Sequence, residues 1–152
     1  DHTPETHLIP LVIEAALKFK EITIFGNDYS TKDGTCVRDY IHVCDLADAH
    51  VLAINSLTQT VSKSIKNSPS IEPCRIYNLG NGSGYSVKEI ISITEKISQN
   101  KIKSHISTRR VGDPAILVAS ATKIIQELGW KPKYPNIEHI IKHAFYWHKK
   151  NL

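Results

Sequence analysis

Helix-periodic segments alternate with short apolar runs along this chain, and that alternation is the strongest constraint on its fold. Apolar residues recur at helical spacing in several stretches, and runs rich in β-branched residues lie between them. Strands that alternate with helices are typical of an α/β fold. The chain has 152 residues, enough to bury one core, so we expect one compact unit. The runs expected to form strands are 22–25, 37–43, 75–79, 103–108 and 116–119.

Polar residues mark the expected starts of the helices, because a side-chain oxygen there can accept a backbone N–H of the first turn. These residues are Thr6, Asp45, Ser86, Ser120 and Asn136. A glutamate follows Ser86 three residues later, which predicts a capping box, and Gly129 is expected to end the fourth helix. The residues expected on the buried face of the first helix are Leu8, Leu11, Val12, Ala15, Ala16 and Phe19.

Two polar stretches interrupt this pattern. Residues 27–34 are bounded by glycines and are expected to form a surface loop. Residues 56–74 are rich in Ser, Thr, Asn and Lys and contain two prolines. This composition predicts a mobile surface insertion.

Composition excludes several classes of protein. The net charge of +4 is spread evenly, which argues against nucleic-acid binding and is compatible with an anionic ligand. Three widely spaced cysteines do not suggest a disulfide framework and favour a reducing cytoplasm. No apolar run is long enough to span a bilayer, so no membrane partner is expected. The chain begins at Asp1 and contains no methionine, which we interpret as the mark of a fragment.

Three motifs have the form of catalytic or metal sites but not the context. The turn at 80–84 follows an expected strand, yet its glycines do not have the spacing of a dinucleotide fingerprint. Tyr146 and Lys150 have the spacing of a short-chain dehydrogenase pair, but they stand at the chain end, where helices fray. His139 and His143 could share a metal, but no further ligand is placed beside them. We therefore predict no catalytic, cofactor-binding or metal-binding residue in this chain.

Two arginine-containing segments are the remaining candidates for a ligand site. Arg38 begins an expected strand, and Arg109 and Arg110 lie in a turn between strand-like runs. Guanidinium groups from separate segments could clamp a diphosphate. Ordinary surface ion pairing, for example of Arg38 with Asp39 or Asp45, is the alternative that spacing leaves open.

Several motifs resemble those of UDP-glucose 4-epimerases, which are extended short-chain dehydrogenase/reductases. The most particular is FGNDYSTKDGT at 25–35, which leads into VRDYIHV at 37–43. ETHLIP at 5–10, YNLG at 77–80, RRVGDPA at 109–115 and LGW at 128–130 follow the family's order. The resemblance covers nearly the whole chain except residues 56–74. It implies the substrate-binding domain of such an enzyme over 1–152, with 75–97 returning to complete a Rossmann-like sheet in an absent NAD-binding domain.

The resemblance also implies a role for individual residues. Arg38 and Arg110 match the arginines that bind the diphosphate, and Asp113 matches the acid that binds the ribose hydroxyls. Thr23, Ile24 and Phe25 match the strand that lines the uracil. His7 and Leu8 match the segment that closes over the nucleotide. Tyr40 lies near that site, and Leu117 matches the position that limits N-acetylated sugars.

The reaction implied is the interconversion of UDP-galactose and UDP-glucose through a 4-keto intermediate, with NAD bound by the absent N-terminal part. The chain alone is then expected to be inactive, and the implied partners are a UDP-hexose, the missing half and a second copy in a homodimer of the complete enzyme. Two alternatives remain open. One is a fragment of a related nucleotide-sugar epimerase, dehydratase or decarboxylase, and the other is a non-catalytic module that binds UDP-sugars.

Overall fold

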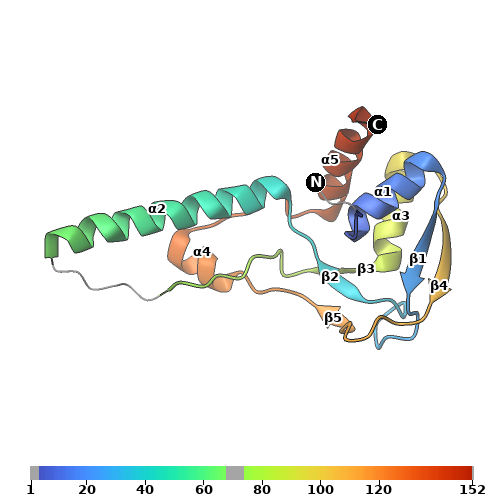
Figure 1. Ribbon diagram of the computed structural model, residues 1–152, viewed down its shortest axis with the longest axis horizontal. Helices are drawn as coiled ribbons and strands as arrows, with labels where there is room; N and C mark the ends of the chain where they lie inside the picture. The colour runs from blue at the N-terminus through green and yellow to red at the C-terminus, as the bar shows by residue number, and fades with distance from the viewer. Residues whose placement is uncertain (1–3, 68–73, 152) are drawn as a thin grey trace.

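The computed structural model describes residues 4–67 and 74–151 and confirms an α/β fold. The helices are α1 (Leu8–Lys18), α2 (Val43–Asn67), α3 (Val87–Ser98), α4 (Thr122–Leu128) and α5 (Ile137–Lys150). The strands are β1 (Glu21–Phe25), β2 (Val37–Asp39), β3 (Gly84–Ser86), β4 (Lys103–Ser107) and β5 (Ile116–Leu117). Figure 1 shows α1, α3, α5, β1 and β4 gathered at one end, whereas α2 and α4 form an arm at the other.

The larger core lies at the end where helices cover the parallel pair β1–β4. Alternate residues of β1, Ile22 and Ile24, point into this core, so Glu21, Thr23 and Phe25 project from the other face. Helices α1, α3 and α5 supply the remaining apolar side chains. The buried members are Val12, Ala15, Ala16, Ile22, Ile24, Ile90, Ile91, Ile102, Ile137, Ile140 and Ile141.

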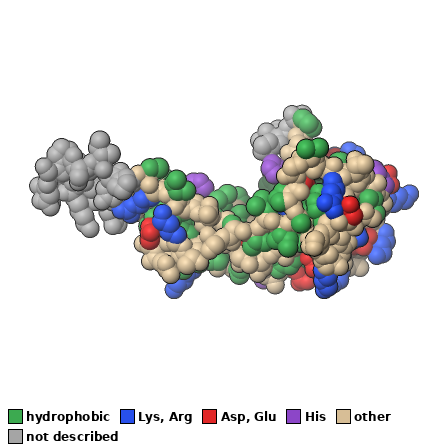
Figure 2. All heavy atoms as spheres, turned by 90° about the horizontal axis from the view of Figure 1, so that it is seen from below, with side chains coloured by type: hydrophobic (Ala, Val, Ile, Leu, Met, Phe, Trp, Pro, Cys, Tyr) green, Lys and Arg blue, Asp and Glu red, His purple; other side chains and the backbone are tan. Residues whose placement is uncertain are grey.

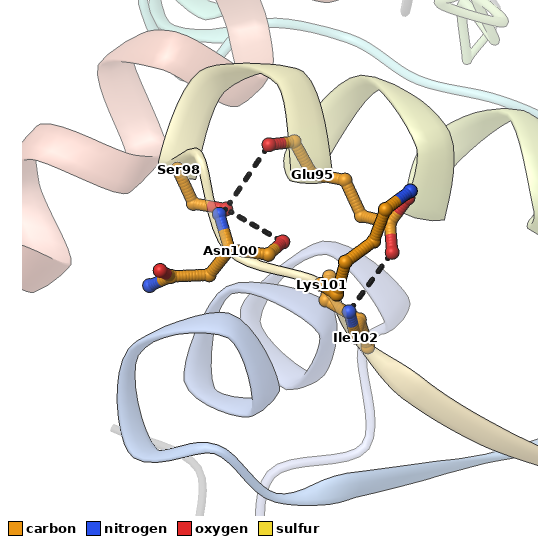
Figure 3. Close-up of polar contacts among 5 residues, drawn as sticks. All are labelled: Glu95, Ser98, Asn100, Lys101 and Ile102. Atoms are coloured by element: carbon orange, nitrogen blue, oxygen red, sulfur yellow. Dashed lines mark hydrogen bonds and ion pairs between the residues drawn. The ribbon is translucent and has the colours of Figure 1, made fainter.

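A hydrogen-bonded turn fixes the path from α3 into β4 (Figure 3). Glu95 accepts the backbone N–H of Ile102 at 2.9 Å and the Lys101 Nζ at 3.0 Å. Ser98 Oγ accepts the N–H of Asn100 at 3.2 Å, and the Asn100 amide donates to the Ala16 carbonyl of α1 at 3.0 Å. These bonds hold β4 in register with β1, so that His105 lies beside Thr23.

The smaller sheet has the order β3-β2-β5. Strand β2 is antiparallel to β3 and parallel to β5, and Arg38 is in register with Tyr85 on one side and Leu117 on the other. Figure 1 shows this sheet between the larger core and the arm. Arg38 is thereby held on a central strand, where its backbone position is fixed from both sides.

A second, smaller core anchors the arm. Ala49 of α2 packs with Ala121, Ile124 and Trp130, and Tyr77 and Leu79 lie against them. The Trp130 indole donates to the Asp45 carbonyl at 3.0 Å. The Asp45 carboxylate is fully buried and accepts the backbone N–H groups of Lys133 and Tyr134 at 2.8 and 3.0 Å.

The predicted cap at Ser86 and the predicted start of the last helix near Asn136 are confirmed. Ser86 accepts the Glu89 N–H while the Glu89 side chain accepts the Ser86 N–H, which is the predicted capping box. Asn136 caps α5 by accepting from the Glu138 N–H at 2.7 Å. Gly129 ends α4 in the left-handed conformation, as expected.

The other three predicted caps are wrong. His7, not Thr6, occupies the N-cap of α1, and its side chain makes no capping bond. Asp45 lies within the first turn of α2 because the buried loop at 133–134 recruits its carboxylate. His42 precedes that helix, and its Nδ1 accepts the Cys44 N–H at 3.1 Å. Ala121 stands at the N-cap of α4, one residue after the predicted Ser120.

Several predicted boundaries also differ. Strand β2 ends at Asp39, so 40–43 is not part of it. Phe19 is exposed rather than buried, because it ends α1 in the left-handed conformation and turns away from the core. Helix α2 continues to Asn67, so residues 56–67 are helical rather than irregular, and 68–73 lie outside the described residues.

The strand predicted at 75–79 does not form. A run of apolar and β-branched residues becomes a strand only where a partner strand offers hydrogen bonds. Within residues 4–67 and 74–151, no strand pairs with this segment. Its Ile76 carbonyl instead accepts from the Lys123 side chain at 3.0 Å.

Candidate ligand-binding site

One pocket brings together most of the predicted ligand-binding residues. It lies between α1, β1, β2 and the turn at 110–113, with a volume of about 470 Å³. Both apolar and charged side chains line it, as expected for a small-molecule site. The predicted residues that line it are Leu8, Thr23, Phe25, Arg38, Tyr40, Arg110 and Asp113.

Arg38 is held in the pocket by three acceptors. Its Nη2 lies 2.5 Å from Asp113 Oδ1, and its Nη1 donates to the carbonyls of Val37 at 2.7 Å and Pro114 at 2.9 Å. Both Arg38 and Asp113 are mostly buried. The structure therefore pairs Arg38 with Asp113, whereas the ion pairs considered from sequence were with Asp39 or Asp45.

Arg110 lines the same pocket from the 110–113 turn. Its guanidinium carbon lies 3.9 Å from the centre of the Phe25 ring, which is a cation–π contact. Two guanidinium groups from β2 and from the 110–113 turn thus face one cavity. Two guanidinium groups that face one cavity suit a ligand with more than one anionic oxygen.

Arg109 has a different role from its neighbour. It pairs with the Asp28 carboxylate at 2.6 Å, also donates to the Asp28 carbonyl, and lies 4.3 Å from the centre of the Tyr29 ring. The bond from Arg109 holds the pKa of Asp28 below its ordinary value. Arg109 therefore fastens the 110–113 turn to the loop after β1, outside the pocket.

Tyr40 and Cys36 line the pocket beside Arg38. Burial raises the pKa of Tyr40 to about 12 and also raises the pKa of Cys36. Both groups keep their protons at neutral pH. They can act as hydrogen-bond donors toward a ligand but not as bases.

The loop at 27–34 is anchored rather than free on the surface. Tyr29 is buried, and its N–H donates to the Gly34 carbonyl at 2.9 Å. The Asp33 carboxylate accepts from Thr35 at 2.7 Å and from Ser86 at 2.5 Å. Burial alone would raise the pKa of Asp33, but these hydrogen bonds lower it. The loop thus connects β1 to the start of α3 and stabilises one wall of the pocket.

The glycine turn at 80–84 surrounds a carboxylate of its own chain. Asp39 accepts the N–H groups of Asn81 at 3.0 Å and Gly82 at 3.1 Å. A Cβ at Gly80 would lie 2.4 Å from an Asp39 oxygen, so glycine is needed there. With these N–H groups already bonded, the turn does not fit a dinucleotide phosphate.

Three predicted residues lie outside the pocket lining. Ile24 points into the larger core. His7 is at the N-cap of α1, where it pairs with Glu5 at 2.8 Å. Leu117 is exposed on β5, beside Arg38 in the sheet register.

Other residues in the pocket were not predicted from the sequence. Glu14 and Lys20, which pair at 3.0 Å, lie at its α1 edge, and Glu21 lies on β1. The alternation Glu21, Thr23, Phe25 was the available signal, since these positions share one face of the strand. The helical spacing of Glu14 carried no such information.

The histidines on α5 do not form a metal site in the described part of the chain. No group of three or more His, Cys, Asp or Glu residues there could hold a metal ion. His143 instead bonds His42, which directly precedes α2, with 3.0 Å between the ring nitrogens. Burial and then His143 lower the pKa of His42. Tyr146 is exposed near the end of α5.

The fold and the pocket define an α/β unit that presents two arginines and an aspartate to one small-molecule cavity. The sequence model of the GDP-mannose 4,6 dehydratase family matches residues 1–143, and the chain belongs to this family. Among the described residues, no helix is both long and apolar enough to cross a membrane.

The chain is similar in sequence and structure to UDP-glucose 4-epimerases. It is 47% identical to a UDP-glucose 4-epimerase of Halalkalibacterium halodurans over 99% of its own length and 42% of that protein. A crystal structure of a UDP-glucose 4-epimerase matches with a TM-score of 0.85 and 48% identity, over 99% of this chain and 43% of the other. The enzyme of Bifidobacterium longum, solved with NAD⁺ and UDP, matches with a TM-score of 0.81 and 40% identity, over 95% and 40% of the two chains. The predicted resemblance is confirmed, and it extends over about two fifths of these relatives' length.

Proposed function

We propose that this chain is the UDP-sugar-binding part of a UDP-glucose 4-epimerase. The observation that carries the proposal is the convergence of Arg38, Arg110 and Asp113 on a pocket whose wall is the aromatic Phe25. Likeness to epimerases at 47% identity supports this substrate class. Because the chain spans about two fifths of such proteins, the reaction belongs to a longer protein than this one.

The two arginines are proposed to bind the diphosphate. Each guanidinium can direct two N–H groups at phosphate oxygens, and their separate origins allow them to act on both phosphates. Arg38 already lies 2.5 Å from Asp113, so the diphosphate and the ribose hydroxyls would meet where these two side chains meet. Removing one arginine is expected to cost about 1.5–3 kcal/mol of binding, which is typical of a charged hydrogen-bond partner.

The nucleobase is proposed to lie along β1 and against Phe25. Strand β1 pairs with β4 on one side, and within the described residues no strand pairs with its other edge. Backbone N–H and C=O groups on such an edge can read a flat base. Arg110 now covers a face of Phe25, so we expect it to move toward the phosphates when the base binds.

A hexose at the far end of the diphosphate would be held less firmly. Inversion at C4 requires the sugar to present both faces while the UDP stays fixed. Tyr40, protonated at neutral pH, can donate a hydrogen bond but cannot remove the C4 hydroxyl proton. The base for that step and the NAD are expected on a part outside this chain, because the 80–84 turn does not fit a dinucleotide.

The arm is proposed to dock that missing NAD-binding part. Val43, Val51, Ile54 and Leu57 are each more than half exposed on α2, and their spacing places them on one face. Segment 75–79 lies beside this arm without a strand partner among the described residues. An apolar helix face next to an unpaired extended segment is the surface a sheet-containing partner would cover. We therefore expect the chain to be inactive alone, and 75–97 to complete the partner's sheet.

Two further features belong to the proposal. Cys36, Cys44 and Cys74 are free thiols, which supports a cytoplasmic location. A homodimer is expected only for the complete enzyme.

Calorimetry with UDP tests the proposal. We expect saturable binding to the chain and its loss in the Arg38→Ala, Arg110→Ala double variant. Arg75→Ala is the matched control, because Arg75 donates to the Ser56 hydroxyl of α2, outside the pocket. Absence of UDP binding by a chain that circular dichroism shows to be folded would refute a nucleotide site here.

A related nucleotide-sugar enzyme is the second candidate. The family model of GDP-mannose 4,6 dehydratase favours a wider substrate class, and a UDP-Glc/GlcNAc 4-epimerase of Campylobacter jejuni matches with a TM-score of 0.76 and 40% identity, over 94% of this chain and 40% of that one. Leu117 is the proposed size-determining position. A panel of UDP-hexoses and UDP-N-acetylhexosamines, tested on the complete enzyme, separates these activities. A non-catalytic module would bind UDP-sugars and gain no activity when the missing part is restored.

A further inference from the structure

A tyrosine in the loop after β1 is buried together with its hydroxyl. Tyr29 is only 5% exposed. Its hydroxyl oxygen has no hydrogen-bond partner among residues 4–67 and 74–151. A buried polar group without a partner costs free energy, so each such group in a folded protein calls for a physical explanation.

The ring of Tyr29 is packed against the start of the turn that carries the ligand-binding residues. The Arg109 guanidinium carbon lies 4.3 Å from the ring centre, and the 110–113 turn follows Arg109 directly. A Cβ at Gly26 would lie 2.7 Å from both Tyr29 Cε2 and Arg109 Cγ, so glycine is what allows these two side chains to meet. The Tyr29 N–H also donates to the Gly34 carbonyl at 2.9 Å. This packing holds the hydroxyl in one position relative to the turn.

The pocket acts electrostatically on this hydroxyl. Burial, followed by the charges of Asp113 and Cys36, raises the pKa of Tyr29. Asp113 and Cys36 both line the pocket. The hydroxyl therefore keeps its proton at neutral pH, within reach of the Asp113 charge, and can donate that proton in a hydrogen bond.

A bound diphosphate would change the surroundings of Asp113. In the structure, Asp113 Oδ1 lies 2.5 Å from Arg38 Nη2. A diphosphate that binds Arg38 competes with this carboxylate for the same guanidinium and brings further negative charge beside it. Asp113 then needs another hydrogen-bond donor to keep its orientation.

We propose that Tyr29 is a positioning residue, whose hydroxyl donates to Asp113 once a nucleoside diphosphate engages Arg38. This inference rests on the proposed nucleotide-binding function of the pocket. Tyr29 is not among the side chains that line the cavity, so it acts through Asp113 and not on the ligand itself. The hydroxyl that is unpaired among the described residues of the free chain gains its partner in the complex.

Tyr29→Phe tests this role, because it keeps the ring and the Arg109 contact and removes only the hydroxyl. The melting temperature of the free chain should not fall, since this hydroxyl has no partner to lose among the described residues. Calorimetry on the 152-residue chain should show UDP binding weakened roughly 2- to 12-fold, the range for one hydrogen bond. Tyr77→Phe is the matched control. It removes a hydroxyl that donates to Glu127 at 2.8 Å on the arm, and it should leave UDP affinity unchanged.

NMR of tyrosines labelled at the carbon that bears the hydroxyl gives a second readout, which a purely structural role would not change. The signal missing from Tyr29→Phe identifies Tyr29, and UDP should move it in the direction of a hydrogen-bonded phenol.

The outcomes separate this inference from the proposed function. Equal UDP affinity in wild type and Tyr29→Phe, or a Tyr29 signal that UDP leaves in place, overturns the positioning role. The nucleotide site still stands if the double arginine variant has lost UDP binding. A lower melting temperature of free Tyr29→Phe would also contradict the inference, because the hydroxyl would then be paired before the ligand arrives. No UDP binding by wild type overturns both proposals.

Discussion

The two ends of the molecule differ in how completely they bury their apolar residues. At the pocket end, α1, α3 and α5 enclose a core that includes Val12, Ile90 and Ile141, all fully buried. On the arm, the core is small, and α2 leaves a face of large apolar side chains in solvent. Figure 2 shows charged side chains gathered at the pocket end and apolar ones exposed along the middle of the visible face. The pocket end thus buries its apolar side chains within the described residues, whereas the arm leaves the uncovered apolar face that the proposed docking requires.

Trp130→Ala should have the largest effect on the free energy of unfolding. It should destabilise the arm and leave the pocket end folded. Trp130 is the largest buried side chain of the smaller core, and its indole bonds the Asp45 carbonyl. We expect a loss of about 3–5 kcal/mol, typical of deleting a buried aromatic side chain. The measurement is the free energy of unfolding from urea titration, followed by UDP binding. If Trp130→Ala abolishes UDP binding as well as destabilising the arm, the two ends are not independent.

Asp45→Asn should weaken the same region by a smaller amount. The substitution leaves one oxygen to accept from either Lys133 or Tyr134 and removes the acceptor for the other N–H. An unpaired buried N–H costs about 1–3 kcal/mol. Thermal unfolding of the variant, with Asp48→Asn on the exposed side of α2 as control, measures the loss. Equal melting temperatures for the two variants would show that the Asp45 contacts contribute nothing.

The sequence was most informative at the pocket end, where local chemistry determines structure. Ser86 and Glu89 predict their capping box because both partners lie within one helical turn. The arginine segments stood out from the sequence itself, and family motifs then selected Arg38 and Arg110. Their convergence depends on the pairing of β2 with β5, which no local pattern shows. The strand predicted at 75–79 does not form, although its local sequence favours one. Its residues favour a strand, but the partner that would supply hydrogen bonds is absent from the described residues.

Tertiary contacts also explain why the cap predicted at Asp45 is wrong. Asp45 was predicted to be a cap because aspartate is common at that position. In the structure its carboxylate oxygens instead accept the backbone N–H groups of Lys133 and Tyr134. His105 could not be linked to Thr23 from spacing, since the two residues meet only through the parallel pairing of β1 and β4. Long-range pairing therefore determines the parts of the site that sequence patterns leave open.

Ser86→Ala should destabilise the pocket end. It removes the cap of α3 and one hydrogen bond to Asp33, and loss of such a cap costs about 0.5–2 kcal/mol. The bonded Asp33 has a lowered pKa, so its contribution is present at neutral pH and is lost as the pH falls below about 4. The difference in unfolding free energy between wild type and variant should therefore shrink on acidification. A difference that stays constant down to strongly acidic pH would contradict the Asp33 contact.

The smallest effect concerns the junction of the two ends, where His42, just before α2, meets His143 of α5. Burial lowers the pKa of His42, so the folded chain binds this proton more weakly than the unfolded chain does. Stability should fall as the pH drops below about 6.5, because unfolding then takes up a proton. His42→Asn keeps an acceptor for the Cys44 N–H and should flatten this dependence, whereas His50→Asn should not. Melting temperatures at neutral and mildly acidic pH measure it, and an unchanged slope would exclude His42 as the source.

Hydrogen exchange of the chain with and without UDP tests most directly whether one end is complete and the other awaits a partner. We predict slow exchange in α1, α3 and β1 that slows further with UDP, most strongly at β1 and residues 110–113. Amides of 74–80 and of the exposed face of α2 should exchange fast in both samples. Arm amides as protected as those of α1 in the free chain, or UDP protection spread evenly over both ends, would contradict the division between a self-contained nucleotide site and a docking arm.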